Sequence, residues 1–373
     1  MTPFLYVHIP FCVRKCAYCD FESHAGRLKD ADAYIDRLLL EAARRKAQYG
    51  IEAVCSVYLG GGTPSLLAPR QLKRLMEGLD TLFPPCRGAE LTLEANPGTL
   101  TPAFLDAARA AGFNRLSLGV QAKQERLLTM LGRIHRFDDA LRAVDMARAA
   151  GFDNISCDVM NELPGQTTDD IRDTLTSLIA LNIQHISCYG LILEPGTPLN
   201  KRVQSGELLL PDEERARELQ LAAVRILRAA GYERYEISNY AKPGFASRHN
   251  CAYWTGEDYL GLGCAAHSFL KGWRFSNPGL DAYLKGTDGT DAYFVDPEGR
   301  MEEAILLGTR MAQGIALSAF QAAYGEERCA KLIATAKRMA GLIELRDGRL
   351  SLTDEGFLVH SAIAAELVCA AEG

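Results

Sequence analysis

The sequence lacks any uninterrupted apolar run of about 18 residues, the length that a membrane-spanning helix requires. Its first residues also lack the basic start and apolar stretch that mark a secretory signal. Positive charge is not in excess, because 41 Lys and Arg stand against 47 Asp and Glu and give a formal net charge of −6. A broadly basic surface for nucleic acid is therefore not expected. We predict a cytoplasmic protein that binds no nucleic acid.

The 11 cysteines lack the even count and regular spacing of a disulfide scaffold, which fits a reducing compartment. Three of them nevertheless lie together, since Cys12, Cys16 and Cys19 follow the β-like run Leu5–Ile9 with the spacing C-x3-C-x2-C. Pro10 ends that run because it offers no N–H to a strand ladder. The three thiols are thus expected in a loop at the carboxyl end of a strand, where α/β folds place their chemistry.

Thiolates this close suit a compact metal centre, and cysteine is the usual ligand of iron–sulfur clusters. Three ligands on a four-iron cluster would leave one iron open to a ligand that is not protein. Two alternatives remain at this point. One is a zinc site completed by a distant fourth residue, and the other is ordinary packing of buried cysteines.

The chain has 373 residues, enough for one large domain and a smaller one. Short apolar runs alternate with amphipathic stretches, as β–α units do. The predicted strands are Leu5–Ile9, Cys55–Leu59, Glu90–Glu94, Arg115–Val120, Ile155–Val159 and His185–Leu191. The predicted helices are Ala31–Gln48, Pro69–Leu82, Thr101–Ala111, Phe137–Ala150, Thr168–Leu181 and Asp212–Ala230. This alternation predicts an α/β fold with a parallel sheet, and periodicity alone does not separate an open sheet from a barrel.

The character of the sequence changes after Gly231. Tyr235–Tyr240 is predicted as one further strand, and the Gly- and aromatic-rich segment that follows as loops and short strands. A helical pattern resumes at Met301, and two β runs separated by Asp347-Gly348 then predict a hairpin. We therefore expect a core domain over 1–232, an extension over 233–300 and a small winged-helix-like domain over 301–373.

Polar or glycine-rich motifs follow four predicted strands. Gly60-Gly61-Gly62-Thr63 lets the backbone approach a ligand closely. The other strand ends carry Glu94, Gln121 and Asp158, and Arg133 lies shortly after Gln121. Because the carboxyl ends of parallel strands meet at one edge, these side chains are expected around one mouth. Arg133 can pair bidentately with a carboxylate there.

The run Y-x-H-I-P-F-C-x3-C-x-Y-C-x-F, from Tyr6 to Phe21, resembles the radical S-adenosylmethionine (SAM) family. More narrowly, it is similar to the branch that holds anaerobic coproporphyrinogen III dehydrogenase and the HemW-type haem chaperones. The resemblance implies a partial (β/α)6 radical SAM barrel with a C-terminal accessory domain. It also implies a [4Fe–4S] cluster on Cys12, Cys16 and Cys19, whose open iron binds the amino and carboxylate groups of SAM. The 233–300 extension would then wrap the barrel mouth.

The resemblance also implies a role for each residue near SAM. By this resemblance, Gly61 and Gly62 would face the methionine amino group, with Thr63 supporting their turn and Glu94 at the same amino end. Arg133 would bind the methionine carboxylate, and Gln121 and Asp158 would bind the ribose. Tyr6 and Tyr18 would lie beside the cluster and the adenine. The chain departs from the family in two places next to the cavity. Ala122-Lys123 replaces a usual Ser-Phe, and Asn161-Glu162 replaces an aromatic residue and a glycine.

Three features favour the chaperone branch over the oxidase branch. Phe21 stands where the oxidase branch has a further cysteine, and only five residues precede Tyr6. In addition, His249-Asn-Cys-Ala-Tyr253-Trp254 matches the H-N-x-x-Y-W motif of HemW-type proteins. His249 is a suitable axial haem ligand, and the two aromatics offer faces for a porphyrin. The alternatives are that His249 caps a turn, or that Cys251, Cys264 or His267 binds the iron.

The resemblance therefore implies a haem-binding chaperone that delivers haem to respiratory proteins and carries a cluster and SAM. Its partners would be haem, a haem-accepting respiratory protein and a flavodoxin- or ferredoxin-type electron donor. Peripheral contact with membrane proteins and a homodimer are compatible with that role. Coproporphyrinogen III dehydrogenase activity is not expected. The alternative is a radical SAM enzyme that acts on a porphyrin or other small molecule, by oxidative decarboxylation or methyl transfer, through a 5′-deoxyadenosyl radical.

Overall fold

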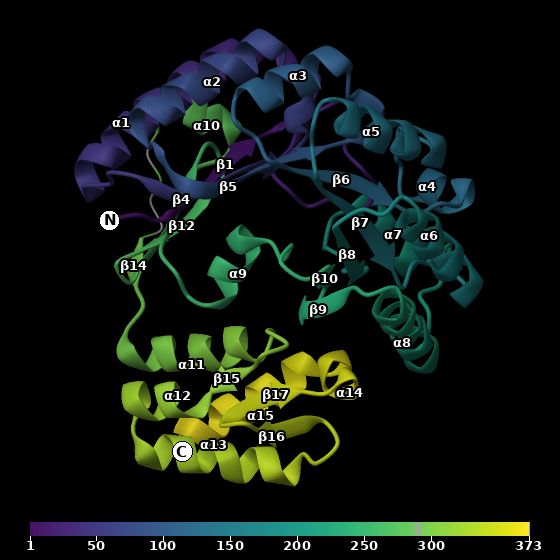
Figure 1. Ribbon diagram of the computed structural model, residues 1–373, viewed down its shortest axis with the longest axis vertical. Helices are drawn as coiled ribbons and strands as arrows, with labels where there is room; N and C mark the ends of the chain where they lie inside the picture. The colour runs from purple at the N-terminus through teal and green to yellow at the C-terminus, as the bar shows by residue number, and fades with distance from the viewer. Residues whose placement is uncertain (288, 290–291, 373) are drawn as a thin grey trace.

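The computed structural model describes residues 1–287, 289 and 292–372, which form a mixed sheet, the helices that cover it and a smaller C-terminal domain (Figure 1). Six parallel strands stand side by side in chain order at the centre of the sheet. They are β1 (Phe4–Ile9), β4 (Val54–Gly61), β5 (Pro85–Ala95), β6 (Arg115–Gln121), β7 (Asn154–Asn161) and β8 (His185–Gly190). Parallel neighbours need crossover connections, and helices supply them here. The arrangement confirms the predicted α/β fold with a partial (β/α)6 barrel.

Helices cover the outer face of these strands (Figure 1). The long ones are α1 (Ala31–Tyr49), α2 (Pro69–Leu82), α3 (Pro102–Ala110), α5 (Phe137–Ala149), α6 (Thr168–Ala180) and α8 (Glu213–Ala229). Shorter elements are β2 (Phe11–Cys12), β3 (His24–Ala25), α4 (Glu125–Met130), α7 (Pro198–Gln204) and the 3₁₀ turns η1 (Leu28–Asp30), η2 (Pro64–Leu66) and η3 (Pro97–Thr99). Each predicted long helix lies within one residue of its observed bounds.

The helix ends follow from local chemistry that the sequence already displays. The Thr101 hydroxyl accepts from the Phe104 N–H at 3.2 Å, and the Asp212 carboxylate accepts from the Arg215 N–H at 2.8 Å. Both side chains satisfy donors that the first helical turn leaves free. Gly112, which follows α3, has a φ of 91°, a conformation that stops a helix and favours glycine.

The two faces of the central strands differ in polarity. Residues such as Leu59, Leu93 and Leu118 are fully buried under the helices and form the main apolar core. Their strand neighbours point the other way, into the barrel, and are polar although they are buried as well. The buried polar residues of the interior include Ser56, Thr92, Arg115, Ser117, Ser156 and His185. Because buried polar groups must find partners, this interior is suited to ligands more than to dry packing.

The segment after α8 contains more regular structure than the sequence indicated. Tyr235–Tyr240, predicted as one strand, is a hairpin of β9 (Glu233–Glu236) and β10 (Asn239–Ala241). The H-N-x-x-Y-W motif lies on a short helix, α9 (Arg248–Trp254). Four strands then extend the sheet beyond β1: β11 (Tyr259–Leu262), β12 (His267–Leu270), β13 (Trp273–Ser276) and β14 (Tyr293–Phe294). Helix α10 (Leu280–Leu284) lies between β13 and β14 in the chain. Segments this short leave little periodicity to detect.

The C-terminal domain has its own apolar core, around Met301, Leu332 and Leu367. Its elements are α11 (Pro297–Gly308), β15 (Ile315–Ala316), α12 (Leu317–Tyr324), α13 (Glu326–Arg338), β16 (Ile343–Arg346), β17 (Arg349–Leu352), α14 (Asp354–Leu358) and α15 (His360–Glu372). The predicted hairpin is present, since β16 and β17 pair across the Asp347-Gly348 turn. The domain meets the barrel through a backbone hydrogen bond of 3.0 Å from Ile237 to Arg310. In the described part of the chain, no helix has the length and apolar character to span a membrane.

Candidate functional site

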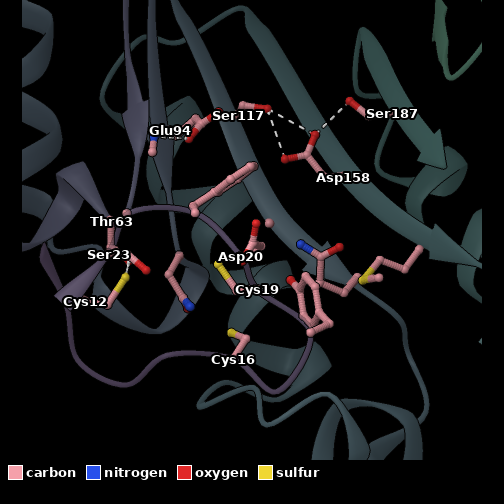
Figure 2. Close-up of a pocket in the computed structure, with 18 of the residues that line it drawn as sticks. Cys12, Cys16, Cys19, Asp20, Ser23, Thr63, Glu94, Ser117, Asp158 and Ser187 are labelled. Carbon is pink, nitrogen blue, oxygen red and sulfur yellow. Dashed lines mark hydrogen bonds between the residues drawn. The ribbon is translucent and has the colours of Figure 1, made fainter. Parts of the chain in front are cut away.

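The three clustered cysteines lie in the segment that leaves β1, with Cys12 at the end of the two-residue strand β2 and Cys16 and Cys19 in the loop after it. All three thiols are free and half-buried, and all three line one cavity of about 500 Å³. Figure 2 shows them gathered at one end of this cavity, with Glu94, Ser117, Asp158 and Ser187 on the other side. The Cys12 thiol lies 3.5 Å from the Thr63 hydroxyl.

The three thiols are not gathered around a single point in this structure. Within residues 1–287, 289 and 292–372, no three His, Cys, Asp or Glu side chains converge closely enough to hold a single ion. A structural zinc site would need four such ligands at about 2.0–2.3 Å from the metal.

The glycine turn after β4 packs directly against the cysteine loop. The Gly62 N–H donates to the Ile9 carbonyl and the Thr63 N–H donates to the Phe11 carbonyl, each at 2.8 Å. A Cβ on Gly62 would stand 2.7 Å from the Ile9 carbonyl oxygen, and one on Gly61 would overlap the His8 ring. Gly61 also has a φ of 101°. Glycine is thus required by close approach between two backbone segments, and both glycines line the cavity.

Glu94 is a half-buried residue near the end of β5, and it lines the cavity. One oxygen accepts from the Tyr58 hydroxyl at 2.6 Å, and the other accepts from the Gly61 N–H at 3.1 Å. Burial raises the pKa of Glu94 to about 7, and the two hydrogen bonds oppose this shift only in part. Glu94 is therefore near its midpoint between the charged and neutral forms at neutral pH.

Asp158 is a second half-buried acidic residue that lines the cavity. It accepts from the Ser117 hydroxyl at 3.2 Å and from the Ser187 hydroxyl at 2.8 Å (Figure 2). Burial raises the pKa of Asp158, and these two donors lower it. Neither serine was among the site residues predicted from the sequence. A period-two reading of β6 and β8 could have found them, because Ser117 shares a face with Gln121 and Ser187 shares one with Tyr189.

Gln121 and Arg133 complete the rim near Cys16. Gln121 has a φ of 70° at a strand irregularity and accepts from the Tyr189 hydroxyl at 3.0 Å. Arg133 donates to the Gly119 carbonyl at 2.5 Å and to the Cys16 sulfur at 3.4 Å. Its Nε is buried without a hydrogen-bond partner among the described residues. An unpaired buried donor at the cavity is what a site for an anionic ligand group would present.

Not every predicted SAM residue lines the cavity. Tyr18 does, but Tyr6 lies deeper in the barrel, where its hydroxyl is 3.0 Å from His8 Nδ1. The cavity instead extends to residues that the sequence analysis did not name. These additional lining residues include Asp20, Tyr58, Met160, Ile192, Asn239 and Asn250. They come from distant parts of the chain, so spacing alone could not group them.

The predicted haem residues lie elsewhere than expected. Helix α9 is at the amino-terminal half of the strands, on the inner side of the sheet facing the C-terminal domain, and not across the barrel mouth (Figure 1). The reason is Glu90, whose carboxylate accepts from the Arg248 and His249 N–H groups, each at 3.1 Å, and so satisfies the first turn of α9.

The His249 ring is itself fully engaged. It is only 1% exposed, and its nitrogens lie 2.6 Å from the Ser56 hydroxyl and 2.9 Å from the Tyr253 hydroxyl. Burial lowers the pKa of His249 to about 3, so the ring is neutral. Trp254 packs under the Arg310 guanidinium, 4.1 Å from the ring centre. His267, the other histidine considered, is exposed.

Comparisons with known proteins identify relatives of this chain. Residues 6–178 match the family model of the radical SAM superfamily, and residues 295–359 match that of the HemN C-terminal domain. The heme chaperone HemW of Bacillus subtilis is 35% identical over 367 residues, which cover 96% of this chain and 97% of that protein. HemW of Escherichia coli is 41% identical over 266 residues, covering 70% and 69%.

A solved structure has the same fold. The Escherichia coli coproporphyrinogen III oxidase HemN, described as a radical SAM enzyme, superposes with a TM-score of 0.84 over 98% of this chain and 90% of its own. At 23% identity this likeness concerns the fold alone.

Glu94→Gln should change how stability depends on pH. The folded pKa of about 7 lies above the unfolded value near 4.5, so the wild type loses stability as pH rises between those values. The loss should be about 2–3 kcal/mol, and the glutamine variant should lack it. Urea unfolding at several pH values measures the difference. Parallel stability curves for the two proteins would contradict the raised pKa.

Proposed function

Because the chain belongs to the HemW family of the radical SAM superfamily, we propose that it is a haem-binding chaperone that holds a [4Fe–4S] cluster and SAM in the barrel cavity. The observation that carries this proposal is identity at 35% over nearly the full length of a protein named as a haem chaperone. In this role it passes haem to a respiratory protein and takes electrons from a flavodoxin- or ferredoxin-type donor.

The cysteine loop fits the cluster by its donor set. Three soft thiol ligands from one loop line a single cavity, which suits iron and sulfide more than a hard cation. Arg133 and Thr63 already contact two of the sulfurs, and such donors tune a bound cluster. When bound, the cluster and SAM supply one-electron chemistry.

The opposite side of the cavity fits SAM. Glu94 offers a carboxylate near the Gly61 and Gly62 backbone, where the methionine amino group is assigned. The unpaired Nε of Arg133 suits the methionine carboxylate. Asp158 and Gln121 are two further acceptors at strand ends that suit the ribose hydroxyls. Tyr18 offers an aromatic face beside the cysteines.

A radical SAM enzyme is the second candidate. It is favoured by the extent of the cavity, which continues past the residues assigned to SAM as far as Asn239 and Asn250. A second molecule bound there would lie next to SAM. Release of 5′-deoxyadenosine together with a changed porphyrin or other small molecule in an anaerobic reaction would favour the enzyme over the chaperone.

Replacing Cys12, Cys16 and Cys19 together with alanine should abolish the cluster. Anaerobically reconstituted wild type should contain iron and sulfide and absorb broadly near about 400 nm, and the triple variant should show neither. The matched control replaces Cys55, Cys86 and Cys369, which lie outside the cavity, and should keep the cluster. Iron content equal to wild type in the first variant would refute the assignment.

Arg133→Leu should weaken SAM binding while the iron content stays normal. The lost charge-assisted contact is worth about 1.5–3 kcal/mol, so the affinity should fall roughly ten- to a hundredfold. Equilibrium dialysis with labelled SAM measures it. Arg136→Leu removes an exposed arginine three residues away and serves as the control. The same affinity in the Arg133 and Arg136 variants would exclude the proposed contact.

Haem coordination by His249 requires α9 to move, because both ring nitrogens are bonded and the ring is buried. Tyr253→Phe removes the hydroxyl at Nε2 and keeps the aromatic face. If His249 is the axial ligand, this change should tighten haem binding several-fold, since one hydrogen bond of about 1 kcal/mol no longer opposes the movement. His249→Ala should shift the Soret band. If the Soret band is the same in wild type and His249→Ala, His249 is not the axial ligand of the haem iron. The exposed His267 would then be tested as the ligand.

A further inference from the structure

Cys55 and Cys86 stand next to each other on neighbouring strands of the sheet. Val54 of β4 is in parallel register with Pro85 of β5, and the two cysteines are the residues that follow this pair. Neighbouring strands lie about 4.8 Å apart, and residues at the same register share a face of the sheet. A disulfide needs Cα atoms about 4.4–6.8 Å apart. The strand pairing therefore places the two cysteines within reach of a bond.

The two thiols are free and in contact with each other. Both residues are half-buried, and neither of them lines the cavity. The Cys55 thiol donates to the Thr2 carbonyl at 3.1 Å. Burial raises the pKa of Cys55, the Thr2 contact lowers it, and a side-chain hydrogen bond with Cys86 raises it. Thiols that share a hydrogen bond can reach bonding distance by rotation of their side chains, without a shift of the strands.

The segment that follows Cys86 anchors helix α9. The strand register slips directly after the two cysteines, and residues 87–89 bulge out of β5. Within this bulge the Gly88 carbonyl accepts from the Arg248 guanidinium at 2.7 Å. Glu90, the next residue of β5, accepts from two N–H groups in the first turn of α9. The cysteine pair therefore lies at the base of the segment that holds the start of this helix.

We propose that Cys55 and Cys86 are a redox modification site, which glutathione disulfide converts reversibly to a disulfide that restrains the start of α9. The pair is separate from the three cysteines that line the cavity. The inference therefore does not depend on the proposed function.

The reaction is a thiol–disulfide exchange in two steps. One thiol of the pair loses its proton, attacks a sulfur of glutathione disulfide and displaces one glutathione. The other thiol then loses its proton and attacks the mixed disulfide, which forms the bond between Cys55 and Cys86 and displaces the second glutathione. Two electrons pass from the cysteines to glutathione disulfide, and the two protons end on the two released glutathione molecules. Excess reduced glutathione reverses both steps.

Anaerobic titration of the whole protein with glutathione disulfide, at a fixed concentration of reduced glutathione, tests the bond. Alkylation and peptide mapping should find the peptides of Cys55 and Cys86 joined, with the loss of two hydrogens. Half of this product should form at a glutathione disulfide concentration at least about tenfold lower than the one that modifies half of the exposed Cys369, because the second step is intramolecular. Mapping counts the cysteines of the cavity separately.

Cys55→Ser and Cys86→Ser are the matched variants. Each should stop at the mixed disulfide, with one glutathione on the remaining thiol of the pair. Cys369→Ser should leave the bond between Cys55 and Cys86 unchanged. Absence of the joined peptides from the wild type at every concentration, with Cys369 fully modified, would overturn the inference. This result is read on the wild type, so a variant that fails to fold does not obscure it.

Hydrogen exchange from the amides of α9 supplies the second measurement. The disulfide ties the base of the anchoring segment to β4, so exchange from α9 should slow several-fold on oxidation. Helix α15 of the C-terminal domain is the internal control and should exchange at the same rate in both forms. Equal exchange from α9 in the oxidised and reduced proteins would overturn the proposed restraint.

Discussion

The site depends on two backbone hydrogen bonds that join the glycine turn after β4 to the segment leaving β1. Gly62 and Thr63 donate to Ile9 and Phe11, so the turn and the start of the cysteine loop are held at backbone contact distance. Parallel pairing of β1 with β4 brings the two ends together, and the missing side chains of the glycines allow the approach. The position of the thiols relative to Glu94 follows, because Gly61 is also bonded to that carboxylate.

The polar interior sets a second constraint. A closed eight-stranded β/α barrel fills its centre with branched apolar side chains, whereas here serines, an arginine and a histidine are buried inside the barrel and the half-buried Glu94 and Asp158 face the cavity. Stability is supplied instead by the outer faces of the strands, where leucines, valines and isoleucines pack under the helices. The fold therefore tolerates buried polar groups in the cavity, and these groups set the charge state that a ligand meets.

Helix α9 connects the cavity to the rest of the molecule. The Glu90 carboxylate accepts a hydrogen bond from the His249 N–H in the first turn of α9. The His249 ring stacks on Tyr58 with ring centres 4.9 Å apart, and Asn250 of the same helix lines the cavity. At its other end Trp254 packs against Arg310 of the C-terminal domain. Movement of α9 would therefore disturb Tyr58, which holds Glu94, and the domain contact at the same time. The H-N-x-x-Y-W motif is thus joined to Glu94 through two successive contacts, His249 with Tyr58 and Tyr58 with Glu94.

The sequence by itself determined the six β–α units, the helix ends and the placement of the cysteine loop and the polar strand ends. These features depend on local rules, such as Thr101 capping the next turn and Pro10 ending a strand, and they appear where the pattern predicted them. Only the tertiary structure decided which residues share the cavity. Ser117 and Ser187 join Asp158 across three strands, and His249 turns inward because Glu90, 159 residues earlier, accepts from its backbone. Such contacts are fixed by strand register and packing of distant segments, which leave no periodic trace in the order of amino acids.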